Sequence, residues 1–245
     1  AKSLIVTRKI EIYHFFDYES DEPLHVRGFQ EALDNMKKAE KIGKQIKYKS
    51  GYSNFTFDNL VNAYKEQISS LIYSGVDCLL IETVFDALNC RAAIVAATKV
   101  YEEKQVVLPI MISGTLTDKS GRTLSGQLLD AFAQSVRNEN VISIGLNCSF
   151  GGADMIPFIK QLAHTEDVYI SCYPNAGLPN VLGEYDELPK MTAGYIRELA
   201  LEKDVNIVGG CCGTTPDHIK AIAEAVEGLE PRKIPKKKKK AFIVD

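Results

Sequence analysis

The sequence predicts an α/β fold, a (β/α)8 barrel of the TIM type, from three observations. From residue 57 onward, short apolar runs alternate with segments whose apolar residues recur at helical spacing. Continuous apolar strands separated by amphipathic helices are typical of a parallel sheet covered by helices. Successive strands begin roughly 30 residues apart, the pitch of a barrel that builds eight such units from about 250 residues.

The expected elements follow this alternation along the chain. The predicted strands are 76–81, 107–113, 141–146, 168–172 and 205–208. The predicted helices are 57–74, 86–104, 124–138, 153–164, 188–203 and 216–228. The last helix has the clearest start, because Thr215 can cap it and Pro216 suits its first position.

The two ends of the chain are less regular than this middle part. Segments 3–7, 9–16 and 45–52 have strand character, and 27–45 has the pattern of a surface helix. Prolines and five consecutive lysines near the C-terminus predict an extended basic tail. We therefore expect three parts: an N-terminal segment 1–53 that belongs to the same domain, a barrel domain 54–230, and a basic tail 231–245.

Composition excludes several classes of function. The net charge is −3, from 29 basic and 32 acidic residues, whereas nucleic-acid-binding domains are usually strongly basic. No apolar run approaches the ~18–20 residues of a membrane span. The neighbourhoods of the six cysteines do not suggest a disulfide framework, and a bridge between adjacent Cys211 and Cys212 would be strained. These observations predict a protein of a reducing compartment, the cytoplasm, with no nucleic-acid or membrane partner.

Polar or thiol groups follow each predicted strand. In a parallel barrel the loops after the strands share one face, and that face carries the chemistry. These groups should therefore surround one pocket. They lie at 82–83, 113–115, 147–149, 172–175 and 209–213.

Three cysteines at two of these strand ends predict a metal site. Cys148, Cys211 and Cys212 can supply three thiolates to a tetrahedral zinc and leave the fourth position open, as in catalytic zinc sites. Adjacent residues of a regular strand point to opposite faces, so the pair needs a bend in the backbone, which the flanking glycines allow. The alternative is that all three are buried apolar cysteines.

Glu82 and Asn175 have two interpretations each. A carboxylate at the end of a buried strand either pairs with a structural base or binds a cationic ligand group. Asn175 is either a labile metal ligand or substrate contact, or a turn residue in Tyr-Pro-Asn-Ala-Gly. The four histidines form no spaced pattern, and we interpret His164 and His218 as surface residues.

The motifs resemble the homocysteine S-methyltransferase family. The resemblance rests on Gly-Gly-Cys-Cys-Gly-Thr-Thr-Pro at 209–216 and Gly-Leu-Asn-Cys at 145–148. Further motifs at 81–86, 112–118, 121–127, 173–180 and 183–186 resemble one branch, the homocysteine-binding module of cobalamin-dependent methionine synthase. The similarity runs from about residue 54 to residue 234.

The resemblance implies a barrel in which Cys148, Cys211 and Cys212 hold zinc and Glu82 binds the amino group of homocysteine. It places Ser113, Asn147 and Asn175 in the wall of the substrate pocket, with no catalytic residue beyond the zinc site. Zinc would ionise the homocysteine thiol, which would attack the methyl group of methylcobalamin to give methionine. The methyl group would come originally from methyltetrahydrofolate, and the partners would be separate cobalamin-binding and folate-binding modules.

Residues 1–53 depart from the family pattern. The Asp-Gly-Ala-Met-Gly-like turn after the family's first strand and the Glu-Thr-Asn-like motif after its second are absent. We therefore expect a shortened or divergent N-terminal part. The alternative functions are a non-catalytic zinc-binding homologue or fragment that acts as a binding or assembly protein, and a methyltransferase that uses a sulfonium or betaine donor.

Overall fold

A computed structural model of the chain describes residues 5–6 and 56–235, and within these ranges the strands form one parallel sheet. Its order is β1-β6-β5-β4-β3-β2. Each later strand lies beside its neighbour in sequence, and the first lies beside the last, as in a parallel barrel. The strands are β1 (Ile5–Val6), β2 (Leu79–Val84), β3 (Ile110–Gly114), β4 (Val141–Gly151), β5 (Tyr169–Asn175) and β6 (Ile207–Val208).

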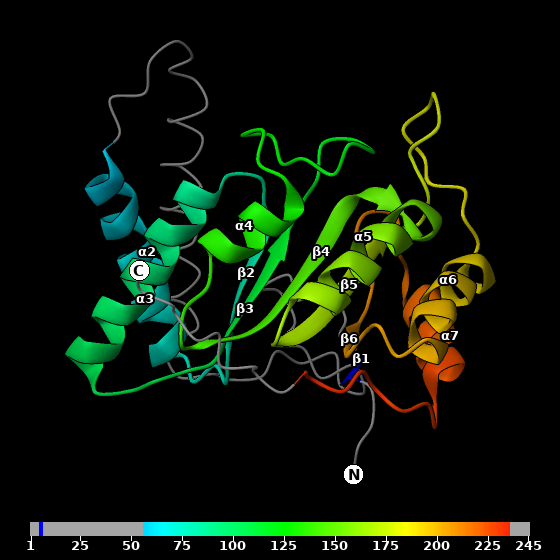
Figure 1. The fold of residues 1–245 in the computed structure, drawn as a ribbon. Helices are drawn as coiled ribbons and strands as arrows, with labels where there is room; N and C mark the ends of the chain where they lie inside the picture. Colours follow the sequence, from blue (N-terminus) through cyan, green and yellow to red (C-terminus); the bar gives the residue numbers. More distant parts are fainter. Residues whose placement is uncertain (1–4, 7–55, 236–245) are drawn as a thin grey trace, which may run out of the picture.

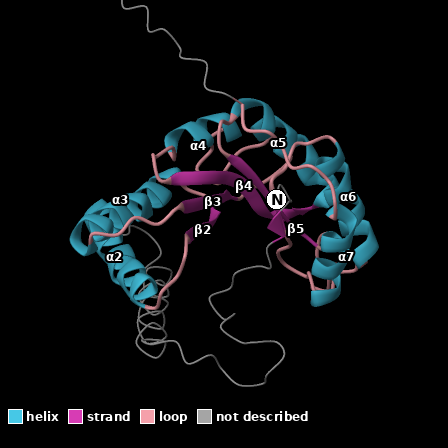
Figure 2. Cartoon of the chain, turned by 90° about the horizontal axis from the view of Figure 1, so that it is seen from below, coloured by secondary structure: helices cyan, strands magenta, loops and turns pink. Residues whose placement is uncertain are grey.

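Helices of the described ranges connect and cover these strands, which confirms the predicted fold class. Figure 2 shows the helices as an arc around the outer side of the curved sheet, and Figure 1 shows the same alternation along the chain. The helices are α2 (Phe57–Tyr73), α3 (Ala87–Lys104), α4 (Leu129–Ser135), α5 (Gly152–Thr165), α6 (Pro189–Leu201) and α7 (Pro216–Val226).

Several element boundaries differ from the expected ones, as three examples show. Strand β2 begins three residues later than predicted, because Gly75 turns the chain at a φ of 83° and Val76 packs beneath the helices before pairing starts. Helix α4 is shorter than predicted, since residues 122 and 128 close a loop through an antiparallel bridge. Strand β4 runs beyond residue 146 to Gly151.

The sheet separates two apolar clusters. The larger one lies between the strands and the helices, and Ile112, Ile144 and Ile170 belong to it. The smaller one lies on the inner face and consists of Met111, Tyr173 and Ile207. Because successive side chains of a regular strand alternate between faces, this division assigns the regularly paired strand residues to the helix side or the inner side.

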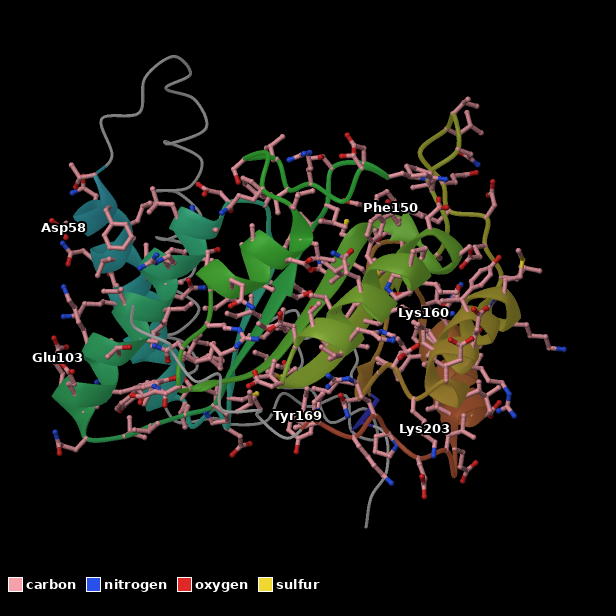
Figure 3. The ribbon with its side chains drawn as sticks, viewed as in Figure 1. Asp58, Glu103, Phe150, Lys160, Tyr169 and Lys203 are labelled. Carbon is pink, nitrogen blue, oxygen red and sulfur yellow. The ribbon has the colours of Figure 1, made fainter. Side chains whose placement is uncertain are left out.

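Figure 3 marks the two ends of the sheet. Tyr169 begins β5 at the end where the strands start. Phe150 lies at the opposite end, where the carboxyl ends of the strands meet, and its ring stacks on Phe158 of α5 with centroids 5.8 Å apart. The loops at this second end are the expected location of the functional groups.

The chain after α7 remains attached to the domain at Arg232. This residue is buried, and its guanidinium donates to the carbonyls of Ala163, at 2.7 and 3.0 Å, and of Val168, at 2.9 Å. It also donates to the carbonyl of Glu166. The predicted basic tail was expected to start at residue 231, and the next residue, Arg232, is buried and hydrogen-bonded to the domain.

Some predictions fall outside the described residues. Strand β1 lies within the predicted strand 3–7. The predicted segments 9–16, 27–45 and 45–52 and the lysine run 236–240 are not covered. Among the described helices, none combines the length and the hydropathy needed to cross a membrane.

Candidate metal and substrate site

The side chains that the sequence singled out share the inner face of the sheet. Glu82 follows Leu80 by two residues, and Ser113 follows Met111 by two, so each pair lies on one face. Asn147 is the register partner of Tyr173, which belongs to the inner cluster. Asn175 lies two residues beyond Tyr173. All four are thus placed at the carboxyl ends of β2 to β5.

Two irregularities in the backbone occur at this edge. Thr83 has a φ of 57°, and the pairing of β2 with β3 shifts register between residues 81 and 84. Cys148 and Ser149 have φ values of 62° and 64°, and the pairing of β4 with β5 shifts between residues 147 and 151. Left-handed backbone is uncommon for residues other than glycine, and bulges near active sites redirect side chains.

The bulge in β4 explains how Cys148 reaches the site. On a regular strand, Cys148 would face the helices, because Asn147 before it faces inward. With the bulge, its Sγ lies 3.7 Å from Sγ of Cys212. The thiol at the end of β4 thus meets the loop after β6.

The Cys211–Cys212 pair lies in a turn after β6, held against the end of β5. The N–H of Cys211 donates to the carbonyl of Pro174 at 2.7 Å. The N–H of Cys212 donates to Oδ1 of Asn175 at 3.1 Å. The following Gly213 has a φ of 78°, and a Cβ there would lie 2.2 Å from the ring of Tyr185. This bend brings both adjacent sulfurs to one side, as the flanking glycines predicted.

The spacing of the three sulfurs fits one tetrahedral metal ion. The Cys148–Cys212 and Cys211–Cys212 Sγ distances are 3.7 and 3.9 Å, and all three sulfurs lie within 4.8 Å of one another. Zinc–sulfur bonds of about 2.3 Å at tetrahedral angles separate two sulfurs by about 3.8 Å. Soft thiolates are ligands that zinc prefers. The donor set and its geometry therefore fit zinc.

The thiols of Cys148 and Cys211 affect each other's pKa. The pKa of Cys148 falls to about 5, chiefly because the Cys211 thiol donates a hydrogen bond to it. The pKa of Cys211 rises for the converse reason, and burial adds to the rise. The hydroxyl of Tyr185 contacts Cys212, and burial followed by the charge of that sulfur raises the pKa of the tyrosine. The lowered pKa thus favours the thiolate form of Cys148 at neutral pH even without metal.

This ionisation predicts selective alkylation of the metal-free protein. Cys148 is a thiolate above pH about 5, whereas burial raises the pKa of Cys90 to about 12 and also raises those of Cys78 and Cys172. Brief treatment with iodoacetamide at pH 7, followed by peptide mass spectrometry, should label Cys148 first, because the thiolate is the reactive form. Added zinc should suppress the labelling. Equal labelling of Cys148 and Cys90 would contradict the predicted ionisation.

Asn147 and Ser113 contact each other rather than projecting separately into the pocket. The Ser113 hydroxyl donates to Oδ1 of Asn147 at 2.7 Å, and both side chains are fully buried. Nδ2 of Asn147 donates to Sγ of Cys211 at 3.6 Å. Two of the predicted pocket residues are thus connected to the cysteine cluster.

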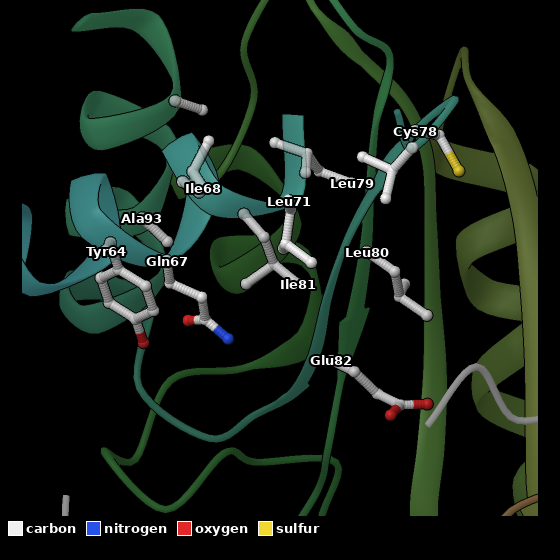
Figure 4. Close-up of a pocket in the computed structure, with 12 residues that line it drawn as sticks. Tyr64, Gln67, Ile68, Leu71, Cys78, Leu79, Leu80, Ile81, Glu82 and Ala93 are labelled. Carbon is white, nitrogen blue, oxygen red and sulfur yellow. The ribbon is translucent and has the colours of Figure 1, made fainter. Parts of the chain in front are cut away.

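Glu82 lies beside two cavities along β2. One has a volume of about 350 Å³ and is lined mainly by apolar residues of α2 and β2 (Figure 4). In this view Leu80 and Glu82 point to one side of β2, while Ile81 points to the side of α2. The second has a volume of about 310 Å³ and continues along Thr83 and Phe85. Glu82 is half-buried and lines both cavities.

Two residues near the site were missed or misplaced by the sequence analysis. His218 was predicted at the surface and is buried: its Nε2 donates to the carbonyl of Glu187 at 2.8 Å, and its Nδ1 accepts the N–H of Thr215 at 3.2 Å. It thus fixes the start of α7 to the loop that carries Tyr185. Tyr185 was noted only within a motif, and its contact with Gly213 becomes visible only in three dimensions.

Comparisons with known proteins identify a family and support the fold. A family model described as homocysteine S-methyltransferase matches residues 25–226, which begins well before residue 54, where the recognisable motifs start. The apo crystal structure of the homocysteine methyltransferase MmuM from Escherichia coli is similar with a TM-score of 0.57 and 18% identity, over 84% of this chain and 77% of that one. The metallated form gives a TM-score of 0.57 and 19% identity, over 76% of this chain and 57% of that one. At this identity the two structures support the fold alone.

Proposed function

The chain belongs to the homocysteine S-methyltransferase family, and on this premise we propose that it is a zinc-dependent module that methylates homocysteine to methionine. The observation that carries the proposal is the convergence of three cysteine sulfurs, at the spacing of tetrahedral zinc ligands, on the carboxyl-end face of the sheet. We propose that residues 54–230 form the barrel domain, that segment 1–53 belongs to the same domain, and that the tail 231–245 follows it.

Each proposed residue has a separate task. Cys148, Cys211 and Cys212 bind zinc, and zinc, when bound, supplies the positive charge that ionises a thiol. Glu82 binds the ammonium group of homocysteine, because a half-buried carboxylate pairs well with a cation. Asn175 holds the backbone of Cys212 in place. The substrate is thus held at both its amino group and its sulfur.

The proposed reaction is a displacement at the methyl carbon. The homocysteine sulfur forms the new S–CH3 bond, and the bond between the methyl group and its donor breaks. The electron pair of the broken bond leaves with the donor. We propose methylcobalamin as this donor, presented by a cobalamin-binding module and remethylated from methyltetrahydrofolate on a folate-binding module. The motifs at 112–118, 173–180 and 183–186, which resemble the methionine synthase branch, support this choice.

A comparison of donors tests the function. Zinc-loaded protein is incubated with homocysteine and, in parallel, with methylcobalamin, S-methylmethionine or betaine, and methionine is measured by mass spectrometry. We expect methionine only with methylcobalamin. Methionine from another donor would support a homocysteine methyltransferase that uses that donor instead of methylcobalamin. Protein that binds zinc and homocysteine but makes no methionine from any of the three would exclude catalysis.

The last outcome would support the second candidate, a non-catalytic homologue that keeps zinc and acts as a binding or assembly protein. The observation that favours it is the absence from residues 1–53 of the motifs that follow the family's first and second strands. The number of zinc ions per chain, measured with and without homocysteine, separates this candidate from a protein without a metal site.

A further inference from the structure

The Asn147 side chain has no hydrogen-bonding capacity left for a substrate. It is fully buried. Its Oδ1 accepts the N–H of Thr83 at 3.1 Å and the hydroxyl of Ser113 at 2.7 Å. Its Nδ2 donates to Oγ1 of Thr83 at 2.8 Å and to Sγ of Cys211 at 3.6 Å. A primary amide offers two donors and two acceptor sites, so all four are in use.

One half of these bonds holds an unusual backbone. Thr83 is β-branched, and at a φ of 57° it is an outlier for its residue type. Such a conformation persists only where the surroundings determine it. The Asn147 amide does so here by binding both the N–H and the hydroxyl of Thr83 across the width of β3. Thr83 directly follows Glu82, so the amide holds the backbone next to the residue that carries the carboxylate.

Another of the four bonds, from Nδ2, acts on the metal-binding cluster. Cys211 is buried, and the Nδ2 of Asn147 approaches its sulfur from the inner face of β4. An N–H donor fixes the position of a sulfur and stabilises negative charge on it. Partners of this kind orient metal ligands without touching the metal.

We propose that Asn147 is a positioning residue rather than a substrate contact, and that its single amide couples the Glu82 turn to the Cys211 sulfur. This inference rests on the proposed function, since it assumes that the two ends bind the ammonium group and zinc. The Glu82 turn and the Cys211 sulfur then both depend on the Asn147 amide. Loss of the amide should weaken zinc binding and the recognition of the ammonium group together, although Asn147 touches neither.

Asn206 provides a matched control. It is also a buried asparagine that bridges chain segments, with Oδ1 accepting the N–H of Ile170 at 3.0 Å and Nδ2 donating to the carbonyl of Arg232 at 2.7 Å. It lies at the opposite end of the sheet, before β6. Variants of Asn206 should therefore lower thermal stability without affecting the cysteine cluster.

The experiment compares Asn147→Ala and Asn147→Asp with Asn206→Ala. Zinc affinity is measured by chelator competition, and ammonium recognition as the ratio of the affinities for homocysteine and 4-mercaptobutyrate, which lacks the amino group. We expect Asn147→Ala to lower zinc affinity about 10- to 100-fold and to lower the ratio. Asn147→Asp keeps the acceptors for Thr83 and Ser113 but places an anion beside Cys211, so it should weaken zinc binding more than it changes the ratio. Asn206→Ala should change neither.

Each outcome decides the inference. Equal zinc affinity in Asn147→Ala and Asn206→Ala would show that Asn147 has only a structural role, and this would overturn the inference. Weaker zinc binding with an unchanged ratio in Asn147→Ala would overturn the coupling. If the unmodified protein binds no zinc, the proposed function fails, and amide hydrogen exchange of Thr83 in the metal-free protein then tests Asn147 alone. Faster exchange in Asn147→Ala but not in Asn206→Ala would support its hold on Thr83, whereas equal exchange would overturn it.

Discussion

Replacement of Cys211 by alanine is expected to abolish zinc retention and, with it, methyl transfer. Cys211 is buried and forms one corner of the sulfur triangle, so its loss leaves two protein ligands and a vacant side. Structural and catalytic zinc sites in proteins keep at least three protein ligands. Zinc per chain after gel filtration in the presence of a chelator measures retention, and methionine formation measures activity.

Cys172→Ala is the matched control for this experiment. Cys172 is a fully buried thiol on the helix side of β5, where its Sγ donates to Sδ of Met155 at 3.6 Å. Its removal should lower stability by creating a small cavity while zinc content stays normal. Far-UV circular dichroism checks that both variants are folded. Normal zinc content in Cys211→Ala would show that Cys211 is not a zinc ligand.

Replacement of Glu82 by glutamine is expected to weaken homocysteine binding without releasing zinc. The change keeps the shape of the side chain and removes its charge, so the ammonium group loses a charge-assisted hydrogen bond. Such a bond contributes about 1.5–3 kcal/mol, which corresponds to a loss of about 10- to 100-fold in affinity. Calorimetric titration of the zinc-loaded protein measures the effect, and 4-mercaptobutyrate should bind both proteins equally.

Glu187→Gln serves as the comparison for Glu82→Gln. Glu187 is also a half-buried carboxylate, but its Oε1 accepts the hydroxyl of Thr192 at 2.6 Å, outside the pocket. This variant should change stability and leave homocysteine affinity as it was. A loss of affinity for 4-mercaptobutyrate as large as that for homocysteine in Glu82→Gln would show that Glu82 shapes the pocket instead of binding the ammonium group.

The order of the strands and the meeting of the cysteines could be predicted because both follow from regular rules. Apolar runs at an even pitch predict a parallel barrel, and the carboxyl ends of its strands meet on one face. The bends that complete the site could not be predicted. Thr83, Cys148 and Ser149 adopt left-handed backbone although none is a glycine, and each contacts residues distant in sequence.

The role of each site residue was harder to predict than which residues belong to the site. Asn147 belongs to the pocket region in sequence and in structure, but only its four bonds reveal that it is saturated. His218 follows Pro216 in the first turn of a helix, a position that is usually exposed. Its burial depends on the loop of Glu187, far away in sequence. Long-range packing of this kind leaves no local pattern.

The pairing of the first strand with the last has a consequence for how the protein folds. Ile5 pairs with Ile207, so this contact closes nearly the whole described chain into one loop. Contacts between residues so distant in sequence form slowly, because the chain entropy of closing the loop is lost before the contact forms. During synthesis on the ribosome, β1 cannot form this pairing until the segment of β6 has emerged. Until this pairing forms, the edges that β1 and β6 present to each other are open to aggregation and to chaperone binding.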